Sequence, residues 1–167
     1  VRQRHAEIDG LWPLPMGFTL KGRADRVDEM ADGTLEMIDF KTGTVPSKGA
    51  MQAFEVPHLL LEAAMVRAGA LEAIAPADTT ALTYIKVGLG PDAFKPLPFV
   101  PSEGHDLMSA ADELGRRMQR HIEHFLFRPT PMPSRLLPLP GQRFAGAYDH
   151  LARMAEWTAA DGGEGEA

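Results

Sequence analysis

The chain contains no cysteine, and this absence narrows the chemistry that is open to it. Disulfides, zinc ribbons and iron–sulfur clusters all depend on cysteine sulfur, so the sequence predicts none of them. Any metal ion must be held by oxygen or imidazole ligands. Such ligands favour a hard cation, for example Mg²⁺.

Positive charge is also scarce, because 17 Lys and Arg residues stand against 23 Asp and Glu, which gives a net charge of −6. Affinity for nucleic acid rests largely on Lys and Arg that neutralise phosphates. The charge balance therefore argues against a free-standing nucleic-acid-binding protein. If the substrate is a polynucleotide, we expect another component to help hold it.

Long apolar runs are missing too. No stretch approaches the roughly 18 apolar residues that a membrane-spanning helix needs, and the first residues lack the order of a signal peptide, so we expect a cytoplasmic protein. What remains is ordinary globular composition, with 44% hydrophobic and 24% charged residues. At 167 residues, one domain is the simplest organisation.

Hydrophobic periodicity gives a coarse order of elements along the chain. Alternating apolar residues predict strands, and apolar residues three or four positions apart predict helices. The predicted strands are residues 4–12, 18–30, 35–41 and 80–88, and the predicted helices are residues 57–69 and 106–127. The strand at 35–41 is apolar on both faces, which is typical of a central strand covered on both sides. The Gly- and Pro-containing segment 42–50 is predicted as a loop.

The last part of the chain has a different composition. Residues 128–141 are rich in proline and predict an extended arm over the surface. Residues 148–157 predict a short closing helix, and residues 158–167 predict a disordered acidic tail. We therefore expect one domain over residues 1–157 followed by that tail.

Charged residues interrupt the apolar strand at 35–41 and raise the question of function. Side chains two positions apart on a strand share a face, so Asp39 and Lys41 point the same way. The pair Asp32–Gly33 is a strong hairpin signal between this strand and the preceding one. A turn with an odd number of residues places Asp25 opposite Asp39, whereas a two-residue turn sends Asp25 to the other face. We predict the odd turn.

Two opposed carboxylates repel each other unless a cation lies between them. Magnesium fits that need, since it takes oxygen ligands, keeps waters and neutralises charge on a phosphoryl oxygen. Lys41 would then orient the attacking water or stabilise the developing charge. The alternative is structural: Asp25 and Lys41 form a cross-strand ion pair, while Asp39 accepts backbone hydrogen bonds in the next turn.

Four segments in this order resemble a known family: GRADRVD (22–28), IDFKTG (38–43), PHLLLEAAM (57–65) and LTYIKVG (82–88). Together they are similar to the RecB-type branch of the PD-(D/E)XK nuclease superfamily. The likeness is strongest to the C-terminal nuclease domains of the AddB subunits of bacterial helicase–nucleases, which process double-strand breaks. The segment 148–157 also resembles the end of the alphaproteobacterial AddB proteins.

The resemblance implies a restriction-endonuclease-like α/β fold, with a central mixed sheet flanked by helices. It implies Mg²⁺-dependent hydrolysis of DNA phosphodiesters, with Mn²⁺ as a substitute and single strands delivered by the helicase of an AddA-type partner. It implies metal ligation by Asp25, Asp39 and the backbone carbonyl of Phe40, with Lys41 catalytic. The expected activity is that of an exonuclease in recombinational repair.

The sequence departs from the family pattern at two places. The family usually has Gln in the first turn of the helix after the D-x-K strand, and His58 stands there, either as a replacement that donates to a phosphate or as a half-buried helix residue. A family helix that adds a ligand ahead of the first strand is incomplete, so we expect a C-terminal fragment of a longer protein. His5 and Glu7 are the nearby replacements, and we expect both on the solvent side of an edge strand.

Other polar clusters are expected to lie on the surface. His121 and His124 have the spacing of helix neighbours without a zinc-hydrolase motif, and Lys48 follows the D-x-K strand in a loop. The basic cluster predicts either contact with a DNA backbone or partner, or a solvated helix face; its members are Arg116, Arg117, Arg120 and Arg128.

Two alternative functions remain open. The first is a catalytically inactive nuclease fold that serves as a scaffold or docking module in the helicase–nuclease complex. The second is a glycosidase with Asp25 and Asp39 as acid and base. The glycosidase leaves Lys41 without a task, and aromatic residues, at 7%, are few for a carbohydrate cleft.

Overall fold

A computed structural model describes residues 1–91 and 93–131. The chain divides into two units, Val1–Phe127 and Arg128–Ala167, and only the first four residues of the second unit are among those described. The predictions of a proline-rich arm, a closing helix and an acidic tail therefore fall almost wholly outside the described residues.

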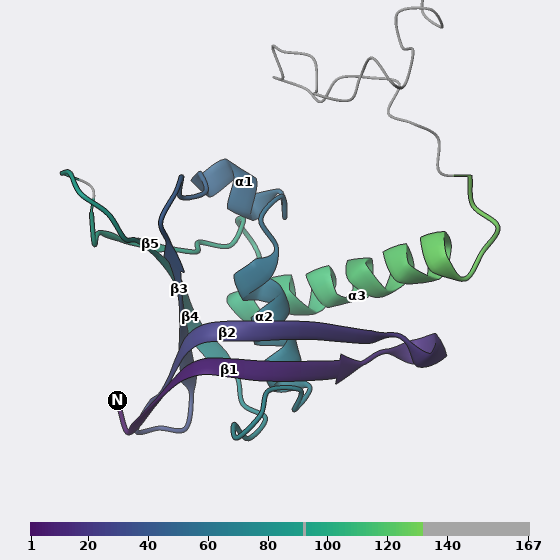
Figure 1. The fold of residues 1–167 in the computed structure, drawn as a ribbon, viewed down its shortest axis with the longest axis horizontal. Helices are drawn as coiled ribbons and strands as arrows, with labels where there is room; N and C mark the ends of the chain where they lie inside the picture. The colour runs from purple at the N-terminus through teal and green to yellow at the C-terminus, as the bar shows by residue number, and fades with distance from the viewer. Residues whose placement is uncertain (92, 132–167) are drawn as a thin grey trace, which may run out of the picture. The chain divides into compact units, whose positions relative to one another are not determined.

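The first unit is a five-stranded mixed sheet with helices packed against it (Figure 1). In chain order its elements are β1 (Gln3–Pro13), the 3₁₀ turn η1 (Pro15–Gly17), β2 (Thr19–Glu29), β3 (Leu35–Lys41), α1 (Lys48–Gln52), α2 (His58–Arg67), β4 (Thr79–Lys86), β5 (Pro96–Pro98) and α3 (Leu107–Leu126). The strand order is β1-β2-β3-β4-β5. Only β3 and β4 are parallel, and the helical segment between them forms the crossover that parallel strands require. The predicted α/β fold with a mixed sheet is confirmed.

The register between β2 and β3 decides where the acidic residues lie. Val27 pairs with Met37 and Glu29 with Leu35, and beyond them the Met30 amide donates to the Thr34 carbonyl at 2.8 Å. The turn thus has three residues, with Gly33 at φ 87°, a conformation that suits glycine. The predicted odd turn is confirmed.

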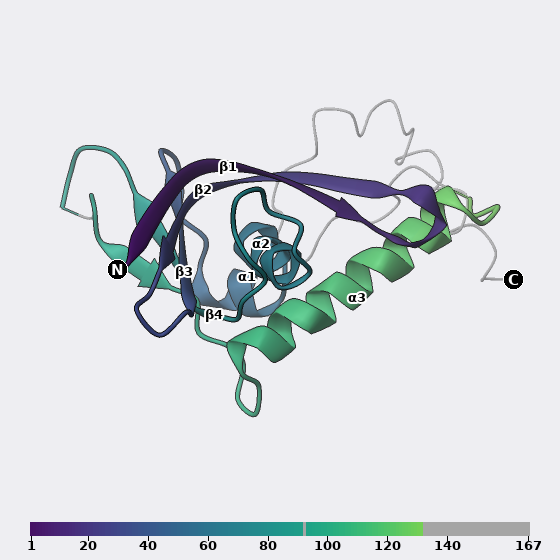
Figure 2. The same cartoon turned by 90° about the horizontal axis from the view of Figure 1, so that it is seen from below.

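One face of the sheet carries the core. In Figure 2 the long β1–β2 hairpin curves over α2, and α3 runs along the other side of that helix. On β3, Leu35 and Met37 are at most 2% exposed and face the helices. Ile38 on the opposite face is half-buried, and Phe40 is 40% exposed. The expectation that this strand is covered on both sides is therefore wrong for the described residues.

Besides the turn η1, two short elements were not predicted. The segment expected as a loop contains α1, whose first turn is capped by the Ser47 hydroxyl, which accepts from the Ala50 amide at 3.1 Å. The strand β5 has proline at both ends, which explains why its pattern does not predict a strand. It lies at the edge of the sheet, where a missing amide donor is tolerated.

Asp28, three residues after Asp25, is buried and paired with two arginines. It is only 2% exposed, and its carboxylate accepts hydrogen bonds from Arg26 and Arg4, the latter at 2.9 Å. These hydrogen bonds, that from Arg26 first, lower the pKa of Asp28 to about 2 against the opposing effect of burial. The paired carboxylate therefore stabilises the β1–β2 hairpin when it is ionised.

We expect Asp28→Asn to lower the free energy of unfolding at pH 7 by about 1–2 kcal/mol. The reason is that the two arginines stabilise the ionised carboxylate in the folded state and not in the unfolded state. The contribution is present above the ordinary pKa of 3.8 and is lost as the pH falls through about 2. Urea unfolding at pH 7 and pH 2.5 measures it. Asp9→Asn is the matched control, because Asp9 pairs with Arg23 across the same two strands while both side chains are more than half exposed. Equal losses in the two variants would contradict the prediction.

Candidate active site at the end of strand β3

The first feature of the site is the position of Asp25 beside β3. Its Oδ2 atom accepts a hydrogen bond from the Phe40 amide at 2.9 Å. The register of the hairpin, extended by one residue beyond the pair Arg26–Ile38, places Asp25 opposite Asp39. The two carboxylates predicted to share a site therefore lie on neighbouring strands at the same level of the sheet.

The second feature is the pair formed by Asp39 and Lys41. Asp39 is 7% exposed, and the Lys41 ammonium donates to its Oδ1 at 3.0 Å. The alternative pairing, in which Lys41 bridges to Asp25 while Asp39 caps the next turn, is not what the structure has. Instead, Asp25 accepts the backbone hydrogen bond and Lys41 pairs along its own strand.

The second carboxylate oxygen of Asp39 has an unusual environment. Oδ2 is buried and receives no hydrogen bond from the described residues. The Lys41 Nζ atom lies 2.8 Å away and forms an ion pair with Oδ2, but only its approach to Oδ1 has the direction of a hydrogen bond. A buried carboxylate oxygen without a donor is costly, and coordination of a cation would satisfy it.

A third oxygen lies at the same edge. The amide and carbonyl of one strand residue point to the same neighbouring strand, and the Phe40 amide points to Asp25. The Phe40 carbonyl therefore faces the Asp25 side, whereas the Lys41 carbonyl faces β4 and accepts from the Val87 amide at 2.8 Å. Two carboxylates and one carbonyl form an all-oxygen donor set, which suits Mg²⁺.

Over residues 2–151 the chain matches the family model of the PD-(D/E)XK nuclease superfamily. The chain belongs to this superfamily. No curated protein matches it. Asp39, Phe40 and Lys41 have the order of the triplet in the superfamily name, and the aspartate predicted to precede them in the site is Asp25, which follows an alanine. Nucleases of the PD-(D/E)XK superfamily typically use divalent metal ions such as Mg²⁺.

Within residues 1–91 and 93–131, no three His, Asp or Glu side chains are close enough to hold a metal ion together. The predicted donor set at β3 accordingly contains two carboxylates, those of Asp25 and Asp39, together with the Phe40 carbonyl. The family resemblance gave the same three ligands. Their combination with the orphaned Oδ2 of Asp39 fits a divalent cation.

Glu62 is a residue that the sequence analysis missed. It lies half-buried on α2, and burial together with the nearby charges of Asp39 and Asp25 raises its pKa to about 8, while Lys41 acts in the opposite direction. The available signal was its position four residues after His58, which places both on one side of the helix. The carboxyl group of Glu62, on a helix, therefore senses the charges of Asp39 and Asp25 without forming a three-carboxylate cluster with them.

Tyr84 closes the site from the neighbouring strand. It pairs with Asp39 in the parallel ladder and is 1% exposed. Burial and the charge of Asp39 raise the pKa of its phenol to about 12, so it is neutral at pH 7. The Lys41 Nζ atom lies 5.6 Å from the centroid of its ring, within the range of a cation–π interaction. Tyr84 therefore helps to hold the lysine in place.

The last of the predicted catalytic residues is His58, the first residue of α2. Its side chain is exposed and makes no hydrogen bond or ion pair with the described residues. The predicted alternative, that His58 is a half-buried helix residue, is therefore wrong. The imidazole ring of His58 is accessible to a ligand. His5 pairs with Glu29 at 3.0 Å, and Glu7 is 68% exposed beside Arg23, so neither belongs to the site.

Three of the four arginines of the predicted basic cluster form an ion network with Glu113. The guanidinium groups of Arg116 and Arg117 lie 3.1 and 2.9 Å from Glu113, and that of Arg120 lies 3.4 Å from it. The hydrogen bonds from Arg117 and Arg116, that from Arg117 first, lower the pKa of Glu113 to about 2. All three arginines are at least half exposed, as expected of a solvated helix face. His121 and His124 are also exposed, as predicted.

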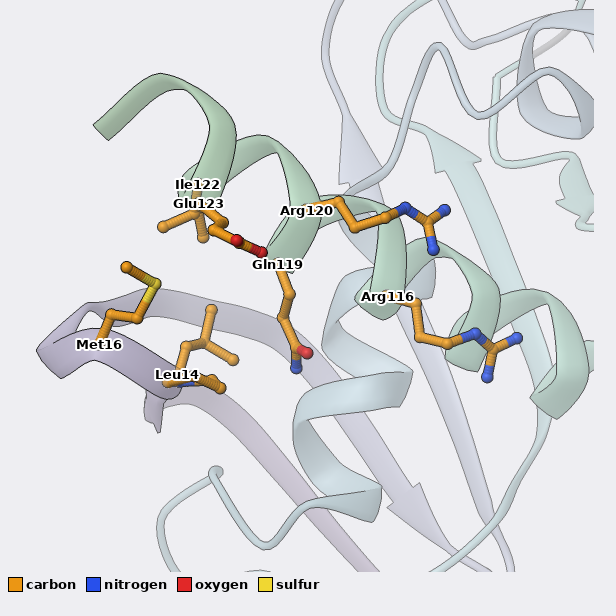
Figure 3. A pocket seen from close by; sticks show the side chains of 8 residues that line it. Leu14, Met16, Arg116, Gln119, Arg120, Ile122 and Glu123 are labelled. Carbon is orange, nitrogen blue, oxygen red and sulfur yellow. The ribbon is translucent and has the colours of Figure 1, made fainter. Parts of the chain in front are cut away.

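A pocket of about 220 Å³ lies between η1 and α3 (Figure 3). Leu14 and Met16 face Ile122 and Glu123 across it, while Arg116 extends away from the turn. None of the residues that line this pocket is one of the predicted catalytic or metal-binding residues. Within the described residues, no helix is long and apolar enough to cross a membrane.

Proposed function

We propose that this chain is a metal-dependent DNA nuclease domain that hydrolyses phosphodiester bonds of single strands. The observation that carries the proposal is the buried Oδ2 atom of Asp39, which lacks a hydrogen-bond donor and lies beside Lys41 at the level of Asp25. A buried carboxylate with a purely structural task is expected to accept hydrogen bonds at both oxygens. A cation site explains the unsatisfied oxygen.

Each residue has a task in this proposal. Asp25, Asp39 and the Phe40 carbonyl hold Mg²⁺, or Mn²⁺ in its place, and the ion when bound supplies charge neutralisation and activation of water. Lys41 stabilises the negative charge that develops on the attacked phosphate. The exposed His58 donates to a neighbouring phosphate of the strand.

The wider role follows from the likeness of the ordered motifs to the AddB nuclease domains. We propose that the chain is the C-terminal nuclease domain of a longer, cytoplasmic AddB-type protein, with the domain itself over residues 1–157. An AddA-type partner delivers single strands for exonucleolytic cleavage during repair of double-strand breaks. Delivery by a motor explains how a chain with net charge −6 acts on DNA.

Metal binding separates this proposal from an inactive scaffold. We expect isothermal titration calorimetry to detect Mn²⁺ binding by the wild type, and Asp39→Asn to bind at least tenfold more weakly, because it removes a charged ligand. Asp9→Asn is the control, since it removes an exposed carboxylate on β1. Unchanged binding by Asp39→Asn would contradict the proposed site, and a wild type without any binding would favour the scaffold.

A further inference from the structure

The connection between β4 and β5 exposes two large apolar side chains. Leu89 is 103% exposed and Phe94 is 66% exposed, the two highest values among the large hydrophobic residues of the described part of the chain. Neither side chain stabilises the fold through the hydrophobic effect, because that stabilisation requires apolar surface to be removed from water. Single exposed apolar residues are common, but two on one short connection indicate a contact surface.

The backbone at Phe94 is held in an uncommon conformation. Its φ is 61°, in the left-handed region that residues other than glycine rarely adopt. Its amide donates to the Lys86 carbonyl at 2.7 Å, which closes the base of the connection just beyond β4. The backbone that carries the exposed ring is therefore held at the end of β4.

This connection begins beside the candidate active site. Lys86 pairs with Lys41 in the parallel ladder, and paired residues of parallel strands point to the same face. The Val87 amide, two residues before Leu89, donates to the Lys41 carbonyl. In Figures 1 and 2 the connection projects from the sheet beyond the end of β3. Ligands of open α/β sheets bind at this end of the parallel strands.

The combination of groups selects the kind of ligand. An unpaired nucleotide offers a flat base to an exposed aromatic ring and a phosphate to the ammonium groups of Lys41 and Lys86. A base in duplex DNA is already stacked and cannot use the ring. A protein partner would need about 1,000 Å² of surface, far more than two side chains supply. The low positive charge of the chain also favours a contact that does not depend on phosphates.

We infer that Phe94 stacks on an unpaired base of the DNA strand whose phosphate lies at the site of Asp39 and Lys41. The inference deepens the proposed function and rests on it for the identity of the ligand. It assigns a selectivity for single strands to this connection. Lys86 then contacts a phosphate next to the stacked base.

Binding without cleavage tests the inference. We expect the full chain in EDTA to bind a fluorescein-labelled oligothymidylate, measured by anisotropy, and Phe94→Ala to weaken that binding roughly fivefold or more. Phe94→Trp should bind at least as well as the wild type, because the aromatic face is kept. An oligonucleotide of the same length with abasic sites keeps its phosphates, so the wild type should bind it as weakly as Phe94→Ala does.

Phe125→Ala is the matched control, because Phe125 is 39% exposed on α3, outside this connection. Its binding should equal that of the wild type. A Phe94→Ala variant that binds the oligothymidylate normally, or a wild type that binds abasic DNA equally well, overturns the inference and assigns the exposed pair to a protein contact. Since EDTA removes cleavage from the assay, failure here leaves the Mn²⁺ test of the nuclease site standing, and the reverse also holds.

Discussion

Replacing Lys41 by alanine is expected to slow cleavage of labelled single-stranded DNA by about 10²–10³-fold in Mn²⁺. The ammonium is the positive group nearest to the buried carboxylate of Asp39, and it is 29% exposed, so it can approach a phosphate from the protein side. Stabilisation of charge that appears only in the transition state acts on the rate of the chemical step. Gel-resolved time courses of a 5′-labelled strand, with enzyme in excess, measure that step.

Metal binding distinguishes this role from a structural one. Lys41 is not a proposed ligand, and its removal frees Asp39 from a competing cation, so Lys41→Ala should keep its Mn²⁺ affinity in calorimetry or gain some. Lys21→Ala is the control for loss of a lysine, because Lys21 is exposed on β2 near η1. A Lys41→Ala variant that cleaves within about threefold of the wild type, a change worth less than one kcal/mol, would remove Lys41 from the chemistry.

Local chemistry explains why the sequence predicts the core of the site. Asp39 and Lys41 share a face wherever a strand forms, because the period of a strand is two residues. The position of Asp25 depends only on the length of one turn, and Asp32 with Gly33 determines that turn: the Asp32 Oδ1 atom accepts from the Thr34 amide at 3.0 Å. Short-range rules therefore suffice for these charged groups.

The parts that escaped prediction depend on tertiary structure. Whether Phe40 lies in a core or in solvent depends on which elements cover the far face of β3. The sequence around Phe40 does not indicate whether any element does. The approach of Glu62 to Asp39 depends on how α2 crosses the sheet, which follows from the packing of side chains such as Leu59 and Met65. Periodicity identifies a buried helix face but not its partner.

Glu62 gives the second large effect, on stability rather than on rate. In metal-free protein we expect the free energy of unfolding of the wild type, relative to Glu62→Gln, to fall by about 2–4 kcal/mol between pH 5 and pH 9. The folded-state pKa of about 8 lies above the ordinary value of 4.5, so the stabilising contribution of the protonated carboxyl is complete below pH 4.5 and is lost as the pH rises through 8. Glutamine resembles the protonated form and does not titrate.

Urea unfolding in EDTA at several pH values measures this difference. Glu55→Gln is the control, since Glu55 is exposed just before α2 and its variant should follow the wild-type pH profile. If Glu62→Gln follows that profile as well, Glu62 does not sense the carboxylates of β2 and β3.

Magnesium should flatten the same profile, and this links stability to the proposed function. After burial, the charges of Asp39 and Asp25 are the causes of the raised pKa of Glu62, and a divalent cation held by these two residues would oppose both. Added Mg²⁺ should therefore raise the free energy of unfolding of the wild type more at pH 9 than at pH 6. Asp39→Asn should lose most of this pH-dependent gain because it removes a ligand and one of the charges. A gain from Mg²⁺ that is equal at both pH values would place the cation away from Asp25 and Asp39.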